Sequence, residues 1–192
     1  MTTEDIISFF DFHAEKWDDF QGRNSQVIAT ILDLGGITEG IDVLDVACGT
    51  GFLFPDYKKR KVKSVKGIDI SPKMVEKAKL KFPDFDIICA DAENYAFENL
   101  FDAVMIYNAF PHFINCEKVV ENLANALKQG GRFTVAHGLS KSELDKIHFQ
   151  SAGNVSTVLP DAEELASLLT PYFDTDVMIS DDTMYIVSGI KK

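Results

Sequence analysis

The chain has 192 residues, of which 46% are hydrophobic, and its formal net charge is −11. This length and apolar content suffice for one sizeable core, so we expect a single domain spanning residues 1–192. The negative charge argues against a nucleic-acid substrate, because phosphate backbones are bound mainly by lysine and arginine.

The N-terminal part is predicted to be helical. Apolar residues recur at helical spacing from Ile6 to Phe20 and from Arg23 to Leu34. Gly22 separates the two segments, and Gly35-Gly36 ends the second. We expect residues 1–36 to form a helical cap on the domain.

After residue 40, short β-branched runs alternate with longer amphipathic stretches, which is typical of βα units and a parallel sheet. The predicted strands are Ile41 to Ala47, Ser64 to Ile70, Asp86 to Ala90, Phe101 to Tyr107 and Gly131 to His137. The predicted helices between them are Phe52 to Arg60, Pro72 to Lys81 and Cys116 to Lys128. Ser71-Pro72 is a strong helix start, and Gly130-Gly131 is read as the end of the last of these helices.

The alternation of predicted strands and helices ends after residue 137. Residues 138–160 are too polar for a core and long for a connection, so we expect a partly helical lid over a substrate. A helix at Asp161 to Leu169 and a hairpin of Asp176 to Ser180 with Met184 to Ile190 follow. The fold class is α/β: a Rossmann-like, mostly parallel, seven-stranded sheet with helices on both faces and an antiparallel C-terminal hairpin strand.

Between the first predicted strand and its helix lies a glycine turn. Gly49 and Gly51 flank Thr50 where larger side chains would block a ligand, and the following helix offers free N–H groups. Asp69 and Asp91 end the next two strands. Because the carboxyl ends of parallel strands share one edge, Asp45, Asp69 and Asp91 should meet where open α/β sheets bind ligands.

Residues 41 to 136 resemble the class I S-adenosylmethionine (SAM)-dependent methyltransferases. The resemblance is carried by VLDVACGTGFL, GIDIS, DAENYAF, FDAVMIYNAFPHF and LKQGGRFTV, in that order. It implies SAM as cofactor and S-adenosylhomocysteine (SAH) as product. The implied cofactor-binding residues are Trp17, Asp45, Ala47, Cys48, Gly49, Gly51, Asp69, Ile70, Asp91, Ala92 and Asn108.

The family assigns different parts of SAM to these positions. The glycine loop would hold the methionine part, Asp69 the ribose hydroxyls and Asp91 the adenine amino group, with Ile70 and Ala92 flanking the ring. Ala47 stands where many relatives have the first glycine of the loop. A nicotinamide dehydrogenase, the main rival, needs a third glycine for helix packing, and that position is Phe54.

The acceptor side of the site is expected beyond the fourth and fifth strands. Methyl transfer requires a positioned nucleophile and, where that nucleophile is protonated, a base. His112 follows the fourth strand, His137 ends the fifth and His148 lies in the polar segment after it. These three histidines are the candidate catalytic residues. Their spacing does not support a metal site.

At the N-terminus, Ala14, Trp17 and Asp18 resemble a segment that folds over the cofactor in similar small-molecule methyltransferases. Trp17 could contact the sulfonium, because aromatic faces attract cations. Packing of an amphipathic helix on the domain would explain Trp17 equally well.

The sequence favours a small-molecule methyl acceptor and leaves its identity open. A non-catalytic SAM- or SAH-binding protein of the same fold is the alternative, and no docking motif points to a protein substrate. No run approaches the ~18 apolar residues of a membrane span, and the N-terminal residues are acidic rather than signal-like. Cys48, Cys89 and Cys116 lack disulfide or zinc spacing. We expect a cytoplasmic protein, monomer or homodimer, that contacts neither nucleic acid nor membrane.

Overall fold

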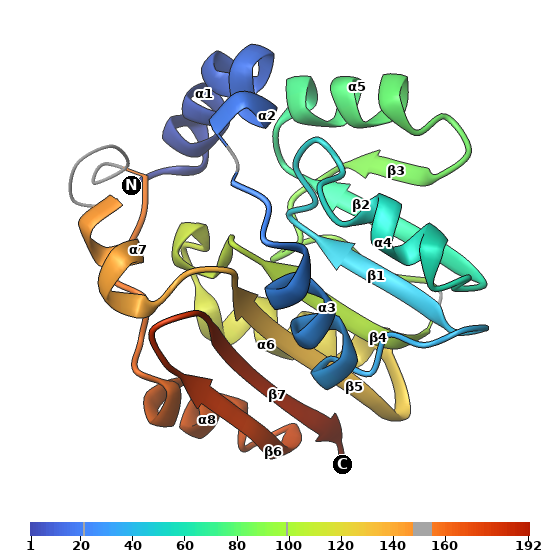
Figure 1. The fold of residues 1–192 in the computed structure, drawn as a ribbon, viewed down its shortest axis with the longest axis vertical. Coiled ribbons are helices and arrows are strands. Elements are labelled where there is room, and N and C mark those ends of the chain that lie inside the picture. Colours follow the sequence, from blue (N-terminus) through green and yellow to red (C-terminus); the bar gives the residue numbers. More distant parts are fainter. Residues whose placement is uncertain (21, 99, 148–154) are drawn as a thin grey trace.

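The computed structural model describes residues 1–20, 22–98, 100–147 and 155–192, and within them the chain is built on a seven-stranded sheet (Figure 1). The strand order is β3-β2-β1-β4-β5-β7-β6. The strands are β1 (Asp42–Val46), β2 (Ser64–Asp69), β3 (Asp86–Cys89), β4 (Phe101–Tyr107), β5 (Leu127–His137), β6 (Phe173–Ser180) and β7 (Tyr185–Lys191). β1 to β5 pair in parallel, and β7 is antiparallel to both β5 and β6. The predicted Rossmann-like α/β fold with its C-terminal hairpin is confirmed.

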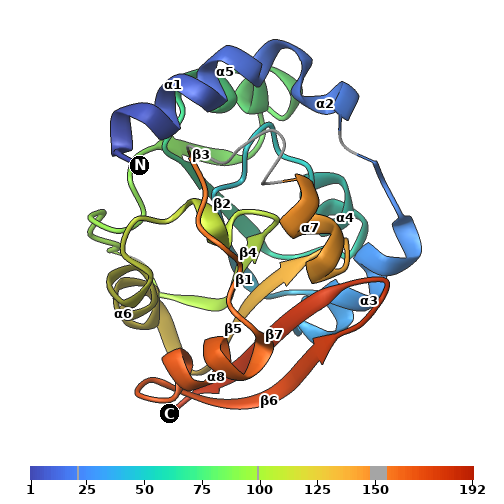
Figure 2. The ribbon, with the colours of Figure 1, turned by 90° about the vertical axis from the view of Figure 1, so that its left-hand side faces the viewer.

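Helices cover both faces of the sheet, as Figure 2 shows. On one face, α3 (Ser25–Leu34), α4 (Phe54–Lys59) and α5 (Pro72–Lys81) enclose an apolar core that includes Ile31, Phe54 and Val75. On the other, α6 (Cys116–Ala126) and α8 (Ala162–Leu169) bury side chains such as Leu123 and Leu165. Both faces of the central strands are therefore apolar, which explains their continuous hydrophobic runs.

The prediction of one continuous helix from Ile6 to Phe20 is wrong. The N-terminal segment consists of α1 (Thr3–His13), a 3₁₀ turn η1 (Ala14–Lys16) and a short α2 (Trp17–Phe20). A capping box between Thr2 and Asp5 starts α1 at an earlier residue than the apolar pattern indicated. The tighter turn at η1 changes the direction in which Trp17 and Asp18 project.

The boundary between the last predicted helix of the βα units and its strand is also wrong. α6 ends at Ala126 rather than Lys128, and β5 begins at Leu127 rather than Gly131. Leu127 is extended, with φ −91° and ψ 144°, and pairs with Phe101 on β4. The β4–β5 register then shifts between Phe101 and Ala103. Gly130-Gly131 therefore lies within an irregular strand and does not end the helix.

The first residues of α5 and α4 are explained by a side-chain cap and by a proline in the first turn. Ser71 caps α5 by accepting from the Met74 N–H at 3.2 Å, as predicted. α4 begins at Phe54, two residues after the predicted start, with Pro55 in its first turn. Within residues 138–160, α7 (Lys141–Ile147) supplies the predicted helical part, and residues 148–154 lie outside the described structure. The role of this segment as a lid stays a prediction. No helix in the described ranges is long and apolar enough to cross a membrane.

Candidate active site

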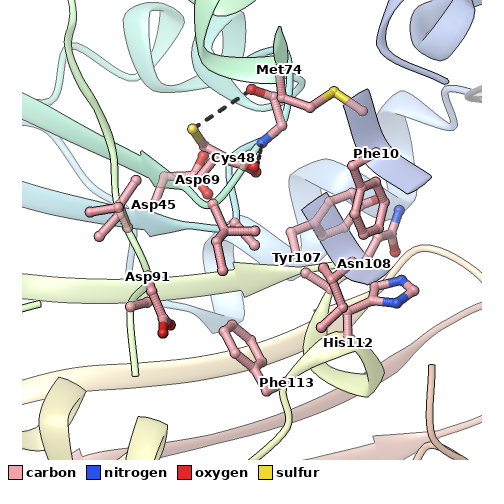
Figure 3. A pocket seen from close by; sticks show the side chains of 18 of the residues that line it. Phe10, Asp45, Cys48, Asp69, Met74, Asp91, Tyr107, Asn108, His112 and Phe113 are labelled. Carbon is pink, nitrogen blue, oxygen red and sulfur yellow. Dashed lines mark hydrogen bonds between the residues drawn. The ribbon is translucent and has the colours of Figure 1, made fainter. Parts of the chain in front are cut away.

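A cavity lies at the carboxyl edge of the parallel strands, where residues of the N-terminal segment also line it (Figure 3). It encloses about 1030 Å³ of empty space, its open mouth included. Its described walls contain ten of the eleven residues predicted to bind the cofactor: Trp17, Asp45, Ala47, Cys48, Gly49, Asp69, Ile70, Asp91, Ala92 and Asn108. Gly51 belongs to the same turn without lining the cavity. The sequence thus predicted residues that the tertiary structure brings together, and their roles stay predictions.

The turn between β1 and α4 is shaped by three left-handed residues in a row of five. Ala47, Gly49 and Gly51 have φ values of +55°, +54° and +85°. A Cβ on Gly51 would lie 2.8 Å from the Phe54 ring, so this position admits only glycine. At Gly49 the nearest atom to such a Cβ is Trp17 Nε1 at 3.7 Å, so this part of the backbone is open toward the cavity. Gly51 is therefore needed for close packing against Phe54, and Gly49 leaves the backbone accessible from the cavity.

Asp69 ties the end of β2 to the glycine turn. One carboxylate oxygen accepts from the Gly49 N–H and the other from the Ser71 N–H, both at 2.8 Å. Burial raises the pKa of Asp69 to about 6, although these two backbone donors oppose the shift. The carboxyl is 8% exposed and lines the cavity, so a ligand can reach it.

Asp45, on β1, is the most buried acid of the site, with 3% of its surface exposed. Burial raises its pKa to about 8, the nearby Tyr57 hydroxyl opposes the shift, and the charge of Asp69 adds to it. Burial also raises the pKa of the Cys48 thiol well above its usual range. Two buried acids with raised pKa values fit a ligand that carries positive charge and hydroxyl groups, since either would stabilise the carboxylates.

Asp91 follows β3 at the third strand end. One of its oxygens accepts from the Glu93 N–H at 2.9 Å, and the Tyr95 N–H donates to its carbonyl at 2.9 Å. These bonds shape a turn that carries Ala92, which is buried, and Glu93 into the cavity wall. Asp91 therefore both closes a turn and faces the cavity (Figure 3).

The fourth strand supplies the opposite side of the cavity. Asn108 has a left-handed φ of +55°, and its side-chain oxygen accepts from the Gly138 N–H at 3.0 Å. The His112 Nδ1 atom lies 2.8 Å from the Val155 carbonyl. A carbonyl oxygen only accepts, so in this contact Nδ1 carries the proton, and a neutral His112 ring then has its lone pair on Nε2.

The three candidate catalytic histidines do not share one position. Among those within the described residues, His112 lines the cavity, whereas His137 is 1% exposed and packs against the Tyr185 ring with centroids 6.0 Å apart. His137 is paired with Tyr185 across the β5–β7 ladder, so the two rings lie on the same face of the sheet, and His137 is not among the residues that line the cavity. His148 lies outside the described residues. No group of three His, Cys, Asp or Glu side chains in those residues could hold a metal ion.

The N-terminal helices close the cavity. Phe10 from α1 stacks edge-on against both Trp17 and His112, at centroid distances of 5.3 and 5.0 Å. Figure 3 shows Phe10 and His112 facing each other at one end of the cavity. Two chain segments a hundred residues apart thus meet around the expected acceptor position.

Three acids hold this cap on α5 and the glycine turn. Asp11 accepts from the Ser71 hydroxyl at 2.5 Å, and Glu15 pairs with Lys77 at 2.9 Å. Asp18 pairs with Lys81 at 2.7 Å and also accepts from the Thr50 hydroxyl at 2.5 Å. Their partners Ser71, Lys77 and Lys81 run from the N-cap of α5 to its last residue, so the cap lies along that helix, as Figure 1 shows.

Several cavity residues escaped the sequence analysis. They are Phe10, Phe52, Met74, Glu93, Tyr107 and Phe113. Tyr107 is the last residue of β4, and position at the carboxyl end of a parallel strand was a usable signal for it. The inward direction of Phe10 depends on how α1 packs, which no local pattern of the sequence determines.

Known proteins share this architecture and sequence pattern. A family model described as "Methyltransferase domain" matches residues 44–135. The chain is 30% identical over 139 residues to the demethylmenaquinone methyltransferase of Renibacterium salmoninarum, covering 69% of this chain and 58% of the relative. It is 28% identical over 133 residues to the malonyl-(acyl-carrier protein) O-methyltransferase of Acetivibrio thermocellus, covering 64% of this chain and 45% of the relative. The chain spans about half the length of the curated relatives it matches.

The fold is also found among solved structures. A putative methyltransferase in complex with the Haloferax volcanii Trm112 methyltransferase activator superimposes with a TM-score of 0.82, covering 97% of each chain at 18% sequence identity. At this identity the similarity establishes the fold.

Proposed function

This chain belongs to the class I SAM-dependent methyltransferases, whose cofactor is S-adenosylmethionine, and we propose that it transfers the methyl group of SAM to a small-molecule acceptor. The observation that carries the proposal is one continuous cavity that joins the glycine turn, Asp69 and Asp91 to the aromatic wall around His112. Its coverage by α1 and α2 favours a small acceptor over a protein chain.

The residues present fit the cofactor. Asp69 is the proposed partner of the ribose hydroxyls and Asp91 of the adenine amino group, with Ile70 and Ala92 beside the ring. The methionine part of SAM is proposed to bind at the open backbone of Gly49, together with Asp45, Ala47, Cys48 and Gly51. Trp17 and Asn108 complete the set. When bound, SAM supplies an electrophilic methyl group on a sulfonium.

The chain's own contribution is to orient the acceptor, exclude water and remove a proton. His112 is the proposed base: the Val155 carbonyl fixes the Nδ1 proton, so Nε2 can accept the proton of the acceptor. Phe10 and Trp17 would exclude water from the reacting groups. His137 keeps only its sequence-based prediction of a catalytic role, because it lies outside the cavity wall.

Two of the relatives are named for their substrates, demethylmenaquinone and malonyl-(acyl-carrier protein). The first is a small molecule and the second carries a small acyl group on a protein, which supports an acceptor group of small size. The three cysteines are free, which supports a cytoplasmic location, where thiols stay reduced. The structural neighbour with a Trm112 activator raises the question of an activating subunit, which copurification would answer.

Calorimetric titration of SAM and SAH into the purified protein tests the proposal. Wild type should bind both, and Asp69→Ala should weaken binding at least about tenfold, because hydrogen bonds to charged groups contribute roughly 1.5–3 kcal/mol. Asp86→Ala is the matched control, since Asp86 sits at the other end of the strands and pairs with Lys66 at 2.6 Å. No binding by folded wild type would refute the cofactor assignment.

Cofactor binding alone would leave the alternative of a non-catalytic SAM- or SAH-binding protein. The two are separated by following SAH release over a panel of acceptors with wild type and His112→Gln. SAH formation that depends on both the acceptor and His112 would establish catalysis.

A further inference from the structure

The wall of the cavity carries negative charge and no positive charge among its described residues. Four acids line it: Asp45, Asp69, Asp91 and Glu93. No described lining residue is a lysine or an arginine. The residues outside the described ranges, Gln21, Asn99 and 148–154, include neither type in the sequence.

Two cations close to the wall, Lys81 and Arg23, already form ion pairs. Lys81 pairs with Asp18 at 2.7 Å and donates to the Thr50 hydroxyl at 3.3 Å. Arg23 lies behind the Phe52 ring, 4.9 Å from its centroid, and forms an ion pair with Asp56. Using either cation for an acceptor would break an existing ion pair.

The acids are not distributed evenly along the cavity. Asp45 lies near the end of β1, Asp69 ends β2 and Asp91 follows β3, all on the side proposed for SAM. On the β4 side, Glu93 is the acid in the described wall, and its carboxylate already accepts from the Ile114 and Asn115 N–H groups at 2.7 and 3.2 Å. The acceptor side therefore offers no charge of either sign for a ligand.

Rings and aliphatic side chains make up the rest of that side. Phe10, His112 and Phe113 line one end, with Ile6 and Ile114 beside them. Tyr107 stacks on Phe52 with ring centroids 5.8 Å apart and an interplanar angle of 8°. Such a surface binds flat apolar groups well, and it leaves a buried anion without the pairing that it needs.

We infer that the methyl acceptor is an electrically neutral, ring-bearing molecule, and that the site rejects acceptors that carry a carboxylate, sulfonate or phosphate. This inference rests on the proposed function and narrows it to a substrate class. An anion at the acceptor side would find no lysine or arginine in the described wall to pair with, and it would share the cavity with the carboxylates of Asp69, Asp91 and Glu93. Repulsion between close like charges at an effective dielectric constant of about 20 is large enough to disfavour it.

Trp17 makes the test direct. It is the chain's one tryptophan and it lines the cavity, so energy transfer from Trp17 reports a bound probe, and the change of a cavity residue described below ties that signal to this cavity. The probes are N-phenyl-1-naphthylamine and its 8-sulfonate, which share a skeleton and differ by one negative charge. Titrated into protein saturated with SAH, the neutral probe should bind at least about tenfold more tightly than the sulfonate.

Two variants show whether charge at the cavity sets the preference. Ile114→Lys adds a cation at the half-exposed rim and should narrow the difference between the probes. Leu80→Lys adds the same charge at an exposed position on α5 outside this cavity and should leave the difference unchanged.

Equal or tighter binding of the sulfonate by wild type would overturn the inference, and so would the absence of energy transfer from Trp17 to the neutral probe. Failure of the proposed function has different signatures: SAH would give no calorimetric heat, or the acceptor panel would give no SAH release. Each result is therefore assigned to one of the two claims.

Discussion

Because Asp45 is protonated in the folded state, the ligand-free protein should become less stable as the pH rises from 6 to 8 and this proton is lost. Burial raises the pKa of Asp45 to about 8, against 3.8 for an exposed aspartate. Between these two values the folded state therefore holds one proton more than the unfolded state. Stability falls with pH wherever the folded state binds more protons, by about 1.4 kcal/mol per pH unit for one proton.

From pH 6 to pH 8 this one group should remove about 2 kcal/mol of unfolding free energy. For a chain of this size that corresponds to a fall of roughly 4 to 8 °C in melting temperature. The neighbouring groups have little effect in this window. Burial places the pKa of Tyr57 and of Cys48 well above it, and the pKa of Asp69, about 6, lies at its lower edge.

Urea denaturation of wild type and Asp45→Asn at pH 6, 7 and 8 measures the effect. Asparagine resembles the protonated acid and does not titrate, so the difference between the two proteins isolates Asp45 from all other groups. Wild type should lose stability relative to the variant as the pH rises. A difference that stays constant, or that grows in favour of wild type, would refute the argument that Asp45 is protonated when folded.

Four further predictions follow from the site. SAM binding at pH 7 should release a proton mainly from Asp45, because the cofactor's positive charge favours its carboxylate whereas Asp69, with a pKa of about 6, is already mostly ionised, and calorimetry in two buffers of different ionisation enthalpy measures this release. Ala47→Gly should raise the unfolding free energy by about 1 kcal/mol, since φ is +55° there, whereas Ala78→Gly in the middle of α5 should lower it in the same urea titration. Thr50→Val should weaken SAM binding more than Lys81→Met does, because the hydroxyl bond to Asp18 is the buried part of the contact that holds the cap, and equal effects in calorimetry would contradict this. His112→Gln should lower kcat about 100-fold or more with little change in the Kd of SAM, and a parallel loss of SAM binding would instead indicate a structural role.

The sheet and the cofactor side of the site were predictable from the sequence. β-branched runs followed by amphipathic stretches are local signals, and each strand with its helix is formed by neighbouring residues. The positions of Asp45, Asp69 and Asp91 at three strand ends placed them on one edge, because parallel strands in a βα fold share their direction. The glycine turn was recognisable because left-handed backbone and close packing leave few residue types that fit.

The boundary between α6 and β5 could not be predicted from the sequence. At residues 127–131 the local pattern favoured a helix that ends at Gly130-Gly131. In the structure Leu127 pairs with Phe101, so the strand begins at Leu127. That pairing joins residues 26 positions apart and its strength depends on the whole β4–β5 ladder, so propensity in a short window could not reveal it.

The acceptor side was decided by tertiary structure. Sequence analysis placed His137 and His112 together because one ends a strand and the other follows one, yet His137 packs beside Tyr185 of β7 and only His112 lines the cavity. Phe10 reaches His112 only because Asp11, Glu15 and Asp18 fasten the N-terminal cap to α5 and the glycine turn. Local sequence determines which elements form and which residues end them; the direction in which a side chain points across a cavity depends on contacts between distant elements, and those exist only in the folded chain.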